Sequence, residues 1–484
     1  MQNKKYYITT TLPYVNAKPH IGFALEIIQA DVLARWQRAR GNEVFFNTGT
    51  DEHGLKIFQK AQELGKTAQE YCDESAEPFR ELKSKLDLSF DNFIRTTDEH
   101  HVKAAQEFWR RCAAKGDIYK KIYKAKYCVG CELEVTDSQL VNGRCPIHPN
   151  KDVETIEEEN YFFRFSKYQQ ALLDLYGKEA NFVLPEGRFN EIKSFATQGL
   201  QDFSVSRVKE KMPWGIPVPG DDSQVMYVWF DALVNYISCL GWPDNEAKFA
   251  EFWGDKENRN AVQVAGKDNL RQQSAMWQAM LMSAGLPCSK QIFIHGFITA
   301  NGQKMSKSLG NVIDPVELVN KYGTDAVRYF MLREIPPTED GDFSYEKFEE
   351  RYNADLAKGI GNLAARVVTI AGKIGAAEKE EAVSPEIKME IEAAQKNLDD
   401  CLKNYKFNEA LAGIWKLINF GDKYIEKTQP WKTKDGAAVG GLLFALGKIA
   451  DMIEPFIPET SAKLNKMLAS QESEILFPRL DAVK

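Results

Sequence analysis

Residues 6–23, YYITTTLPYVNAKPHIGF, decide the fold of this chain, because they lead from an apolar strand into the start of a helix. Tyr6 to Thr10 has the aromatic and β-branched composition of a strand. After two prolines, helical periodicity begins at His20-Ile21-Gly22. The unpaired N–H groups and the dipole at such a helix start favour a bound anion. The stretch therefore predicts a phosphate-type site.

A second strand is expected at residues 43–48, after a helix that ends near Gly41, where glycine suits a helix C-cap. The order strand, helix, strand predicts a right-handed parallel unit. Ligands in such sheets lie at the carboxyl ends of the strands. We therefore expect His20, Asp51 and His53 near one crevice, although helix capping fits Asp51 and an ordinary buried polar role fits His53.

A glycine-flanked loop, residues 301–310 with the sequence NGQKMSKSLG, follows an apolar strand at residues 292–294. Glycine lets the backbone move and approach a ligand closely, and lysine is a compact, mobile charge suited to phosphate. Alone, the loop fits a solvated turn. Together with the upstream anion site, Lys304 and Lys307 predict a second contact to phosphate.

The composition indicates a globular protein of more than one domain. The chain has 484 residues, 44% of them hydrophobic and 27% charged. A net charge of −7 argues against non-specific nucleic-acid binding over the whole surface, but not against a local basic face. The eight cysteines do not suggest a disulfide framework, and we find no apolar signal segment and no run that approaches a membrane span. We expect a reducing cytoplasm and no membrane.

Three of the cysteines cluster within residues 116–225, a stretch whose sequence pattern differs from that of its neighbours. Cys128 and Cys131 form one pair and Cys145 and His148 another, each with two residues between the ligands. This spacing, with 13 residues at 132–144 between the pairs, is typical of tetrahedral zinc, whereas a redox pair needs no second pair. Four protein ligands leave no open position, so we predict structural zinc.

Two further segments carry side chains suited to a pocket. A helix is expected over residues 227–236, with one face made of Trp229, Ala232, Leu233 and Tyr236, although such a stripe also fits an ordinary core. A strand at residues 261–265 leads into Gly266-Lys267-Asp268 at a carboxyl end. From about residue 348 the pattern is helical and predicts a separate all-α bundle of four or five helices.

The paired motifs His20-Ile21-Gly22 and Lys304-Met305-Ser306-Lys307-Ser308 resemble the signature of the class I aminoacyl-tRNA synthetases. The resemblance spans the whole chain, which is similar to the methionyl-tRNA synthetases in particular. The segments that carry this similarity are Leu12-Pro13-Tyr14-Val15-Asn16, residues 50–54, 227–231, 362–366 and 429–431, and the cysteine pairs. The resemblance implies an α/β fold: a Rossmann-like parallel-sheet catalytic domain with a zinc-knuckle connective insert, followed by an all-α anticodon-binding domain. The implied division is catalytic at 1–115, insert at 116–225, catalytic at 226–298, KMSKS loop and stem contact at 299–348, and anticodon-binding at 349–484.

The resemblance implies methionine–tRNA ligase activity, in which methionine and ATP form methionyl-adenylate and the acyl group then passes to tRNA-Met. His20, Lys304 and Lys307 would be catalytic, and Gly22, Gly266, Asp268 and both lysines would bind ATP, which carries Mg²⁺. The methionine residues would be Leu12, Tyr14, Asp51, Trp229, Ala232, Leu233, Tyr236 and Gln273, with Asp51 on the ammonium. The anticodon residues would be Asn362, Arg366 and Trp431. Zinc would be held by Cys128, Cys131, Cys145 and His148, and Arg207 matches a family arginine near the reaction centre.

The sequence departs from the family in three respects. The second signature histidine is Phe23, so one phosphate contact is absent or supplied elsewhere. Asn269 and Gln273 stand where an apolar residue and a histidine are usual. This predicts a wetter methionine pocket that tolerates more analogues; the alternative is that both side chains point away from the substrate and bond to neighbouring backbone. The chain also stops soon after the helical domain, so we expect a monomer.

Three alternatives stay open at this point. Another class I synthetase, for isoleucine, valine, leucine or cysteine, shares the two signatures, but the larger editing enzymes need a bigger insert. A small-molecule nucleotidyltransferase shares the His-x-Gly turn but has no use for a helical domain with Asn362, Arg366 and Trp431. A zinc-knuckle RNA-binding protein would not need residues 304–308.

Overall fold

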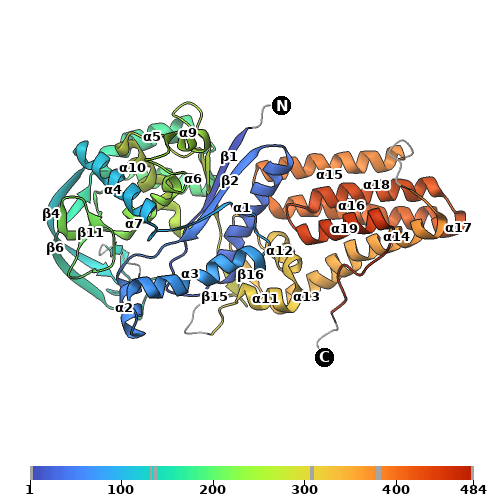
Figure 1. Cartoon of the computed structure of the whole chain (residues 1–484), viewed down its shortest axis with the longest axis horizontal. Coiled ribbons are helices and arrows are strands. Elements are labelled where there is room, and N and C mark those ends of the chain that lie inside the picture. The colour runs from blue at the N-terminus through green and yellow to red at the C-terminus, as the bar shows by residue number, and fades with distance from the viewer. Residues whose placement is uncertain (1–3, 131–132, 136–138, 306–309, 378–382, 481–484) are drawn as a thin grey trace.

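The computed structural model describes residues 4–130, 133–135, 139–305, 310–377 and 383–480. The molecule is elongated, with an α/β body at one end and a helical bundle at the other (Figure 1). Helix α1 (Ile21–Ala39) belongs to the body and also touches the bundle. Its Arg35 pairs with Glu454, and its Trp36 donates a hydrogen bond to Asp399.

A six-stranded sheet, in which all neighbouring strands are parallel, organises the body. Its spatial order is β3-β2-β1-β12-β13-β7. The strands are β1 (Lys5–Thr10), β2 (Glu43–Thr50), β3 (Asn92–Arg95), β7 (Val183–Leu184), β12 (Ala261–Gly266) and β13 (Gln291–His295). The parallel unit predicted from the sequence is confirmed as β1, α1 and β2. The strand order reverses between β1 and β12, the point at which such sheets bind ligands.

Both faces of the sheet are buried, and neighbouring residues of a strand point into opposite cores. Ile8 and Phe293 join the core that contains α1 and α12 (Thr324–Arg333). Tyr7 and Ile292 join the core that contains α4 (Glu99–Ala114) and α10 (Trp277–Ala284). Strands buried on both faces read as continuous apolar runs, and this signal marked β1, β2, β12 and β13. The short strands β3 and β7 were not predicted.

The stretch between α4 and α7 (Val228–Ala232) holds a long antiparallel hairpin of β4 (Ile118–Cys128) and β6 (Val153–Phe163). Its smaller elements are β5 (Leu133–Val135), α5 (Gln169–Lys178), α6 (Glu186–Thr197), β8 (Phe203–Ser204), β9 (Ser206–Val208), β10 (Pro217–Val218) and β11 (Asp221–Met226). Strand β7 comes from the same stretch but pairs with β13, so part of it completes the main sheet.

The helix expected over residues 227–236 is interrupted, which corrects that prediction. It consists of α7 (Val228–Ala232) and α8 (Asn235–Ser238). The Asn235 side-chain amide donates to the carbonyl of Ala232 at 2.6 Å. A side chain that bonds a nearby carbonyl competes with the helical ladder.

The bundle contains five long helices in the part of the chain that the structure describes. These are α14 (Gly361–Ile374), α15 (Pro385–Lys403), α16 (Phe407–Thr428), α18 (Gly436–Ile453) and α19 (Pro458–Ser470). The short helix α17 (Pro430–Thr433) lies at the end of the bundle farthest from the body (Figure 1). The remaining elements are α2 (Leu55–Glu63), α3 (Ala68–Lys85), α9 (Glu246–Trp253), β14 (Ile298–Ala300), β15 (Gln303–Lys304), α11 (Pro315–Tyr322), β16 (Gly341–Phe343) and α13 (Tyr345–Arg351).

Helix α18 is long and apolar enough to cross a membrane by length and composition, contrary to the expectation that no run approaches that size. Of its residues, 67% are buried inside the protein. It packs against α14, α15, α16 and α19. This burial is that of a core helix in a bundle.

Candidate functional site

A cavity of about 1110 Å³ opens at the carboxyl edge of the sheet. Thr11, Asp51, Asp268 and Gly296, which follow β1, β2, β12 and β13, all contribute to its wall. Thirteen residues that the sequence analysis assigned to the site line it: Leu12, Tyr14, His20, Gly22, Asp51, Trp229, Ala232, Leu233, Tyr236, Gly266, Asp268, Gln273 and Lys304. Residues from distant parts of the chain thus meet in one space. Lys307 lies outside the described residues.

His20 is the N-cap of α1, and its ring folds back over the helix start. Its Nδ1 accepts a hydrogen bond from the Gly22 N–H at 3.1 Å. Desolvation by the surrounding wall lowers the pKa of His20, which favours the neutral ring that can accept this bond. A Cβ on Gly22 would come within 2.9 Å of the ring, so glycine lets the ring lie close over the helix start. With Nδ1 as acceptor, Nε2 carries the proton and can donate to a phosphate oxygen.

Asp51 is fixed through its backbone to the segment that follows β1. Its N–H donates to the Pro13 carbonyl at 3.0 Å, and its carbonyl accepts from Val15 at 3.2 Å. The Asp51 side chain is buried in the cavity wall beside Tyr14. This cross-connection brings a carboxylate and an aromatic ring to the same end of the cavity.

Sequence reasoning missed a buried ion pair in the cavity wall, His295 with Glu26. His295 Nε2 lies 2.9 Å from the Glu26 carboxylate, and Nδ1 lies 2.7 Å from the Gly296 carbonyl. Burial alone would lower the pKa of His295, but the bond and charge of Glu26 raise it above its usual value. Both ring nitrogens face acceptors, so the ring is an imidazolium. Glu26 also accepts from the Thr11 backbone and hydroxyl at 2.7 and 2.6 Å.

Histidine at the end of an apolar strand was the available signal for this pair. His295 directly follows Ile294, the last residue of the strand that the sequence analysis identified. Glu26 gave no signal, because an acidic residue on a helix is usually solvated.

Gln273 and Asn269, two of the positions at which the sequence departs from the family, both line the cavity. Gln273 is 1% exposed and bonds side chains at both ends of its amide: it accepts from Gln263 at 3.0 Å and donates to the Tyr236 hydroxyl at 2.6 Å. Asn269 donates to Asp268 at 3.3 Å. Phe23, the third departure, packs edge-on against Phe79, with ring centroids 5.6 Å apart in the same wall.

His53 and Arg207 are not among the described residues that line the cavity. His53 is buried with Nδ1 3.1 Å from Asp231, so it has the ordinary polar role rather than a place in the crevice. Arg207 is buried too, with its guanidinium 4.1 Å from the centre of the Tyr227 ring and a hydrogen bond to Ser204.

Three of the four residues predicted to bind zinc lie close together in the β4–β6 hairpin. The ligand atoms of Cys128, Cys145 and His148 lie within 4.8 Å of one another. Cys128 Sγ and His148 Nδ1 are 3.9 Å apart, close to the roughly 3.5–3.8 Å that tetrahedral zinc bonds require. A Cβ on Gly130 would come within 2.3 Å of the His148 ring, so glycine leaves room for it. Two thiols and an imidazole fit zinc; Cys131, the fourth predicted ligand, lies outside the described residues.

This metal-type cluster touches the cavity through Lys56. The ammonium of Lys56 donates to the Gly130 carbonyl at 2.5 Å. Lys56 also lines the cavity, where it lies 5.8 Å from the centre of the Tyr14 ring.

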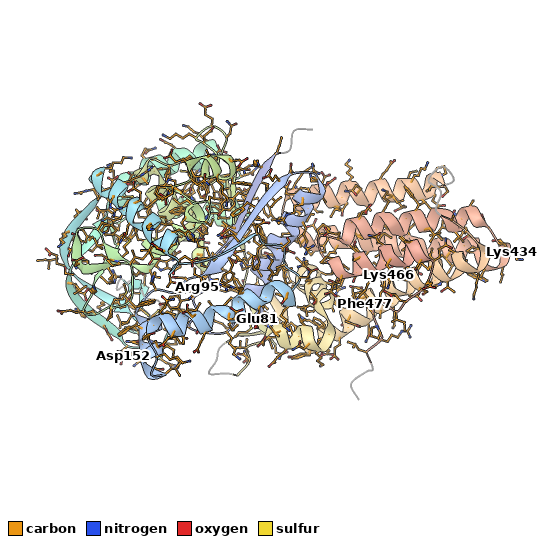
Figure 2. The ribbon with its side chains drawn as sticks, in the orientation of Figure 1. Glu81, Arg95, Asp152, Lys434, Lys466 and Phe477 are labelled. Carbon is orange, nitrogen blue, oxygen red and sulfur yellow. The ribbon has the colours of Figure 1, made fainter. Side chains whose placement is uncertain are left out.

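The predicted anticodon residues lie in the bundle, away from the cavity. Asn362 is exposed on α14, and Arg366 on the same helix pairs with Asp422 at 3.1 Å. Trp431 is 45% exposed on α17, which packs against α14. Lys434, next to the end of α17, marks the tip of the molecule in Figure 2.

Comparison with known protein families identifies the class of enzyme to which the chain belongs. A family model described as tRNA synthetases class I (M) matches residues 6–155 and 149–368, and one described as the anticodon-binding domain of tRNA ligase matches residues 386–482. The chain is a class I aminoacyl-tRNA synthetase by both matches, and the second indicates tRNA as a partner.

Individual relatives narrow this class. The chain is 42% identical to methionine–tRNA ligase of Brucella melitensis, with 99% of this chain and 94% of the relative covered. It is also 42% identical to that of Thermotoga maritima, with 97% and 76% covered. Among solved structures, Mycobacterium tuberculosis methionyl-tRNA synthetase in complex with methionyl-adenylate superposes with a TM-score of 0.89 at 35% identity over 98% of each chain. The chain belongs to the methionine–tRNA ligases.

Proposed function

We propose that the cavity activates methionine with ATP and that the bundle holds the tRNA that receives the acyl group. The observation that carries this proposal is the meeting of His20, Lys304 and Asp51 around one cavity at the strand-order switch. Phosphoryl chemistry depends on positioning and charge neutralisation more than on acid–base groups.

The nucleotide end of the cavity would be formed by the helix start and the glycine-rich segments. His20 Nε2 would donate to an ATP phosphate, and Gly22 leaves the helix start open. Gly266 and Asp268 would face the ribose. Lys304, and Lys307 from the same loop, would neutralise the triphosphate as pyrophosphate leaves. Mg²⁺ would accompany ATP and supply further charge to the phosphates.

The amino-acid end would bind methionine by its charge and by its side chain. Asp51 would accept a charge-assisted bond from the ammonium. Aromatic edges suit a polarizable sulfur, and the thioether pocket would be formed by Leu12, Tyr14, Trp229, Ala232, Leu233, Tyr236 and Gln273.

The tip of the bundle would read the anticodon of tRNA-Met. An exposed aromatic ring, an amide and a guanidinium are the groups that unstacked bases use for stacking and hydrogen bonding. Trp431, Asn362 and Arg366 supply them. The Asp422 carboxylate would orient the Arg366 guanidinium.

We also propose structural zinc at Cys128, Cys131, Cys145 and His148, and the five-part domain division given above. A monomer in the cytoplasm is our proposal for the working form. The apolar helix α18 is a core helix of the bundle.

Amino-acid-dependent exchange of pyrophosphate into ATP, run across all twenty amino acids, tests the activity. We expect exchange with methionine alone at low substrate concentration. Exchange that depends on another amino acid, or that needs none, would contradict the proposal.

A further inference from the structure

A small three-stranded sheet brings Lys304 to the cavity wall. Its order is β15-β14-β16, and β15 and β16 are labelled at the lower centre of Figure 1. Lys304 lies on β15, an edge strand that pairs with β14 through two residue pairs, Thr299 with Lys304 and Ala300 with Gln303. A two-stranded ribbon of this length has little stability of its own in water. The position of Lys304 therefore depends on what holds this hairpin in place.

Asp342 on β16 holds the hairpin at its turn. In the parallel register of β14 and β16 it lies opposite Thr299, and its carboxylate also reaches the turn between β14 and β15. Asp342 Oδ1 accepts from the Gly302 N–H at 2.6 Å and from the Thr299 hydroxyl at 2.7 Å. A carboxylate oxygen can accept two such bonds, so one atom connects both the turn and the middle strand to β16. Bonds to an ionised acceptor are also stronger than bonds between neutral groups.

The turn has the backbone conformation that presents its N–H groups to β16. Asn301 and Gly302 have positive φ angles of 52° and 73°, as in the commonest two-residue hairpin turns. The Asn301 N–H donates to the Phe343 carbonyl at 2.9 Å. Two successive N–H groups of the turn therefore bond to β16, one to its backbone and one to the Asp342 side chain.

A second aspartate, Asp340, fixes the start of the same sheet. Its carboxylate accepts from the Phe297 N–H at 2.9 Å and from the Lys267 ammonium at 2.7 and 2.6 Å. Lys267 directly precedes Asp268, and Asp340, Phe297 and Asp268 all line the cavity. Asp340 thus joins the sheet that carries Lys304 to the segment that carries Asp268.

The charge of Lys304 already acts on Asp268. Burial raises the pKa of the Asp268 carboxyl, and the charge of Lys304 is among the influences that act against this rise. The Lys304 carbonyl also accepts from the Asn311 side-chain amide at 3.2 Å. The backbone of Lys304 is therefore held from the chain that follows it as well as from the turn before it.

We propose that Asp342 and Asp340 are positioning residues that hold Lys304 at the nucleotide end of the cavity, where its ammonium would meet the triphosphate. This inference rests on the proposed function and deepens it. Neither carboxylate acts on the substrate: Asp342 is not among the described residues that line the cavity, and the charge of Asp340 is paired with Lys267. Their effect is on placement, and a catalytic group displaced by about 1 Å can lose roughly 100-fold in rate.

The decisive variant is Asp342→Ala, which removes the shared acceptor. The kcat for methionine-dependent pyrophosphate exchange should fall about 10- to 100-fold, while the KM for methionine stays at the wild-type value because the proposed methionine residues lie elsewhere in the wall. Asp342→Asn keeps an oxygen acceptor for the turn and should restore kcat to within about threefold of the wild type. Glu346→Ala, at an exposed carboxylate on α13, is the control and should leave kcat unchanged.

A double-mutant cycle tests whether Asp342 acts through Lys304. In a Lys304→Ala background the positioned group is gone, so Asp342→Ala should lower kcat by less than about twofold further. Losses that multiply in the double variant would mean that Asp342 acts independently of Lys304, and they overturn the inference.

Asp340→Ala tests the other end of the sheet. It should lower kcat about threefold, and this loss should also disappear in the Lys304→Ala background. Wild-type kcat in both Asp342→Ala and Asp340→Ala overturns the inference, and so does a loss in Asp342→Asn as large as that in Asp342→Ala. Absence of methionine-dependent exchange in the wild type overturns the proposed function instead.

Discussion

Asp51 directly follows β2 and lies in the cavity wall beside the segment that follows β1, and we propose that it binds the amino acid. Replacement by asparagine keeps the shape and removes the charge that would hold the substrate ammonium. A charge-assisted bond is worth about 1.5–3 kcal/mol, so Asp51→Asn should raise the KM for methionine roughly 10- to 100-fold in pyrophosphate exchange. The KM for ATP should change little.

The matched control is Asp222→Asn, at an exposed position on β11. It should leave both Michaelis constants at the wild-type value. If Asp51→Asn moved the KM for ATP and left that for methionine unchanged, the assignment of the two ends of the cavity would be wrong.

The elements that sequence reasoning located best are those with one dominant local signal. The strand before Thr10, the helix start at His20 and the strand ending at Gly266 each combine an apolar run with a glycine or proline boundary, and all three are present. The break between α7 and α8 was not predictable from periodicity, which carries no signal for a side-chain bond such as that from Asn235 to the Ala232 carbonyl.

The site residues also divide into those with a local sequence signal and those without one. Motif residues such as His20 and Asp268 could be assigned from their place after a strand or at a helix start. The pairing of Glu26 with His295 joins residues 269 positions apart, and the bonds of Gln273 to Gln263 and Tyr236 depend on a π-helical turn. Such contacts arise from tertiary packing, which no local pattern in a single sequence reports.

Helix α17 carries Trp431 and lies at the end of the bundle farthest from the α/β body (Figure 1). Trp431→Ala should leave methionine-dependent pyrophosphate exchange intact and reduce aminoacylation of tRNA-Met. One lost base stack costs about 1–3 kcal/mol, or roughly 5- to 150-fold in kcat/KM for tRNA. Met389→Ala, at another exposed apolar side chain of the bundle, is the control. Equal losses in the two assays would mean that Trp431 supports the fold instead.

The hairpin of β4 and β6 carries the proposed zinc ligands. Cys128→Ser should lower zinc content, measured by mass spectrometry, and the melting temperature together, because structural zinc stabilises the folded state. Cys288→Ser removes a half-buried thiol elsewhere and should keep the metal. A Cys128→Ser protein that is metal-free yet melts at the wild-type temperature would rule out a structural role.

At the scale of the whole molecule, the body and the bundle meet around one buried arginine. Arg328 on α12 is fully buried. Its guanidinium pairs with Asp31 of α1 at 2.8 Å and donates to the carbonyls of Leu86 in the body and of Pro455 and Phe456 in the bundle. Because His20 is the N-cap of α1, this contact connects the bundle directly to the helix whose start lines the cavity.

A second buried group at the same junction makes stability depend on pH. Asp325, in the first turn of α12, accepts a hydrogen bond from the Thr460 N–H of α19 at 2.5 Å. Burial raises the pKa of Asp325 to about 6, with the charge of Glu459 acting in the same direction and the bond to Thr460 and the charge of Arg328 acting against it. The carboxyl group is therefore easier to protonate in the folded protein than in the unfolded chain.

The direction of the effect follows from this difference. The folded pKa lies above the unfolded value of about 3.9, so between these pH values the folded state binds more protons. The contribution of Asp325 to stability is full below pH 3.9 and is lost as pH rises through 6. Asp325→Asn removes the charge and should raise the free energy of unfolding by about 1–3 kcal/mol at pH 7.5. At pH 4.5 most of that gain should be gone. Denaturant melts of Asp325→Asn, the wild type and the exposed control Asp222→Asn at both pH values measure it, and an equal gain at both would show that the Asp325 carboxyl does not titrate in this range.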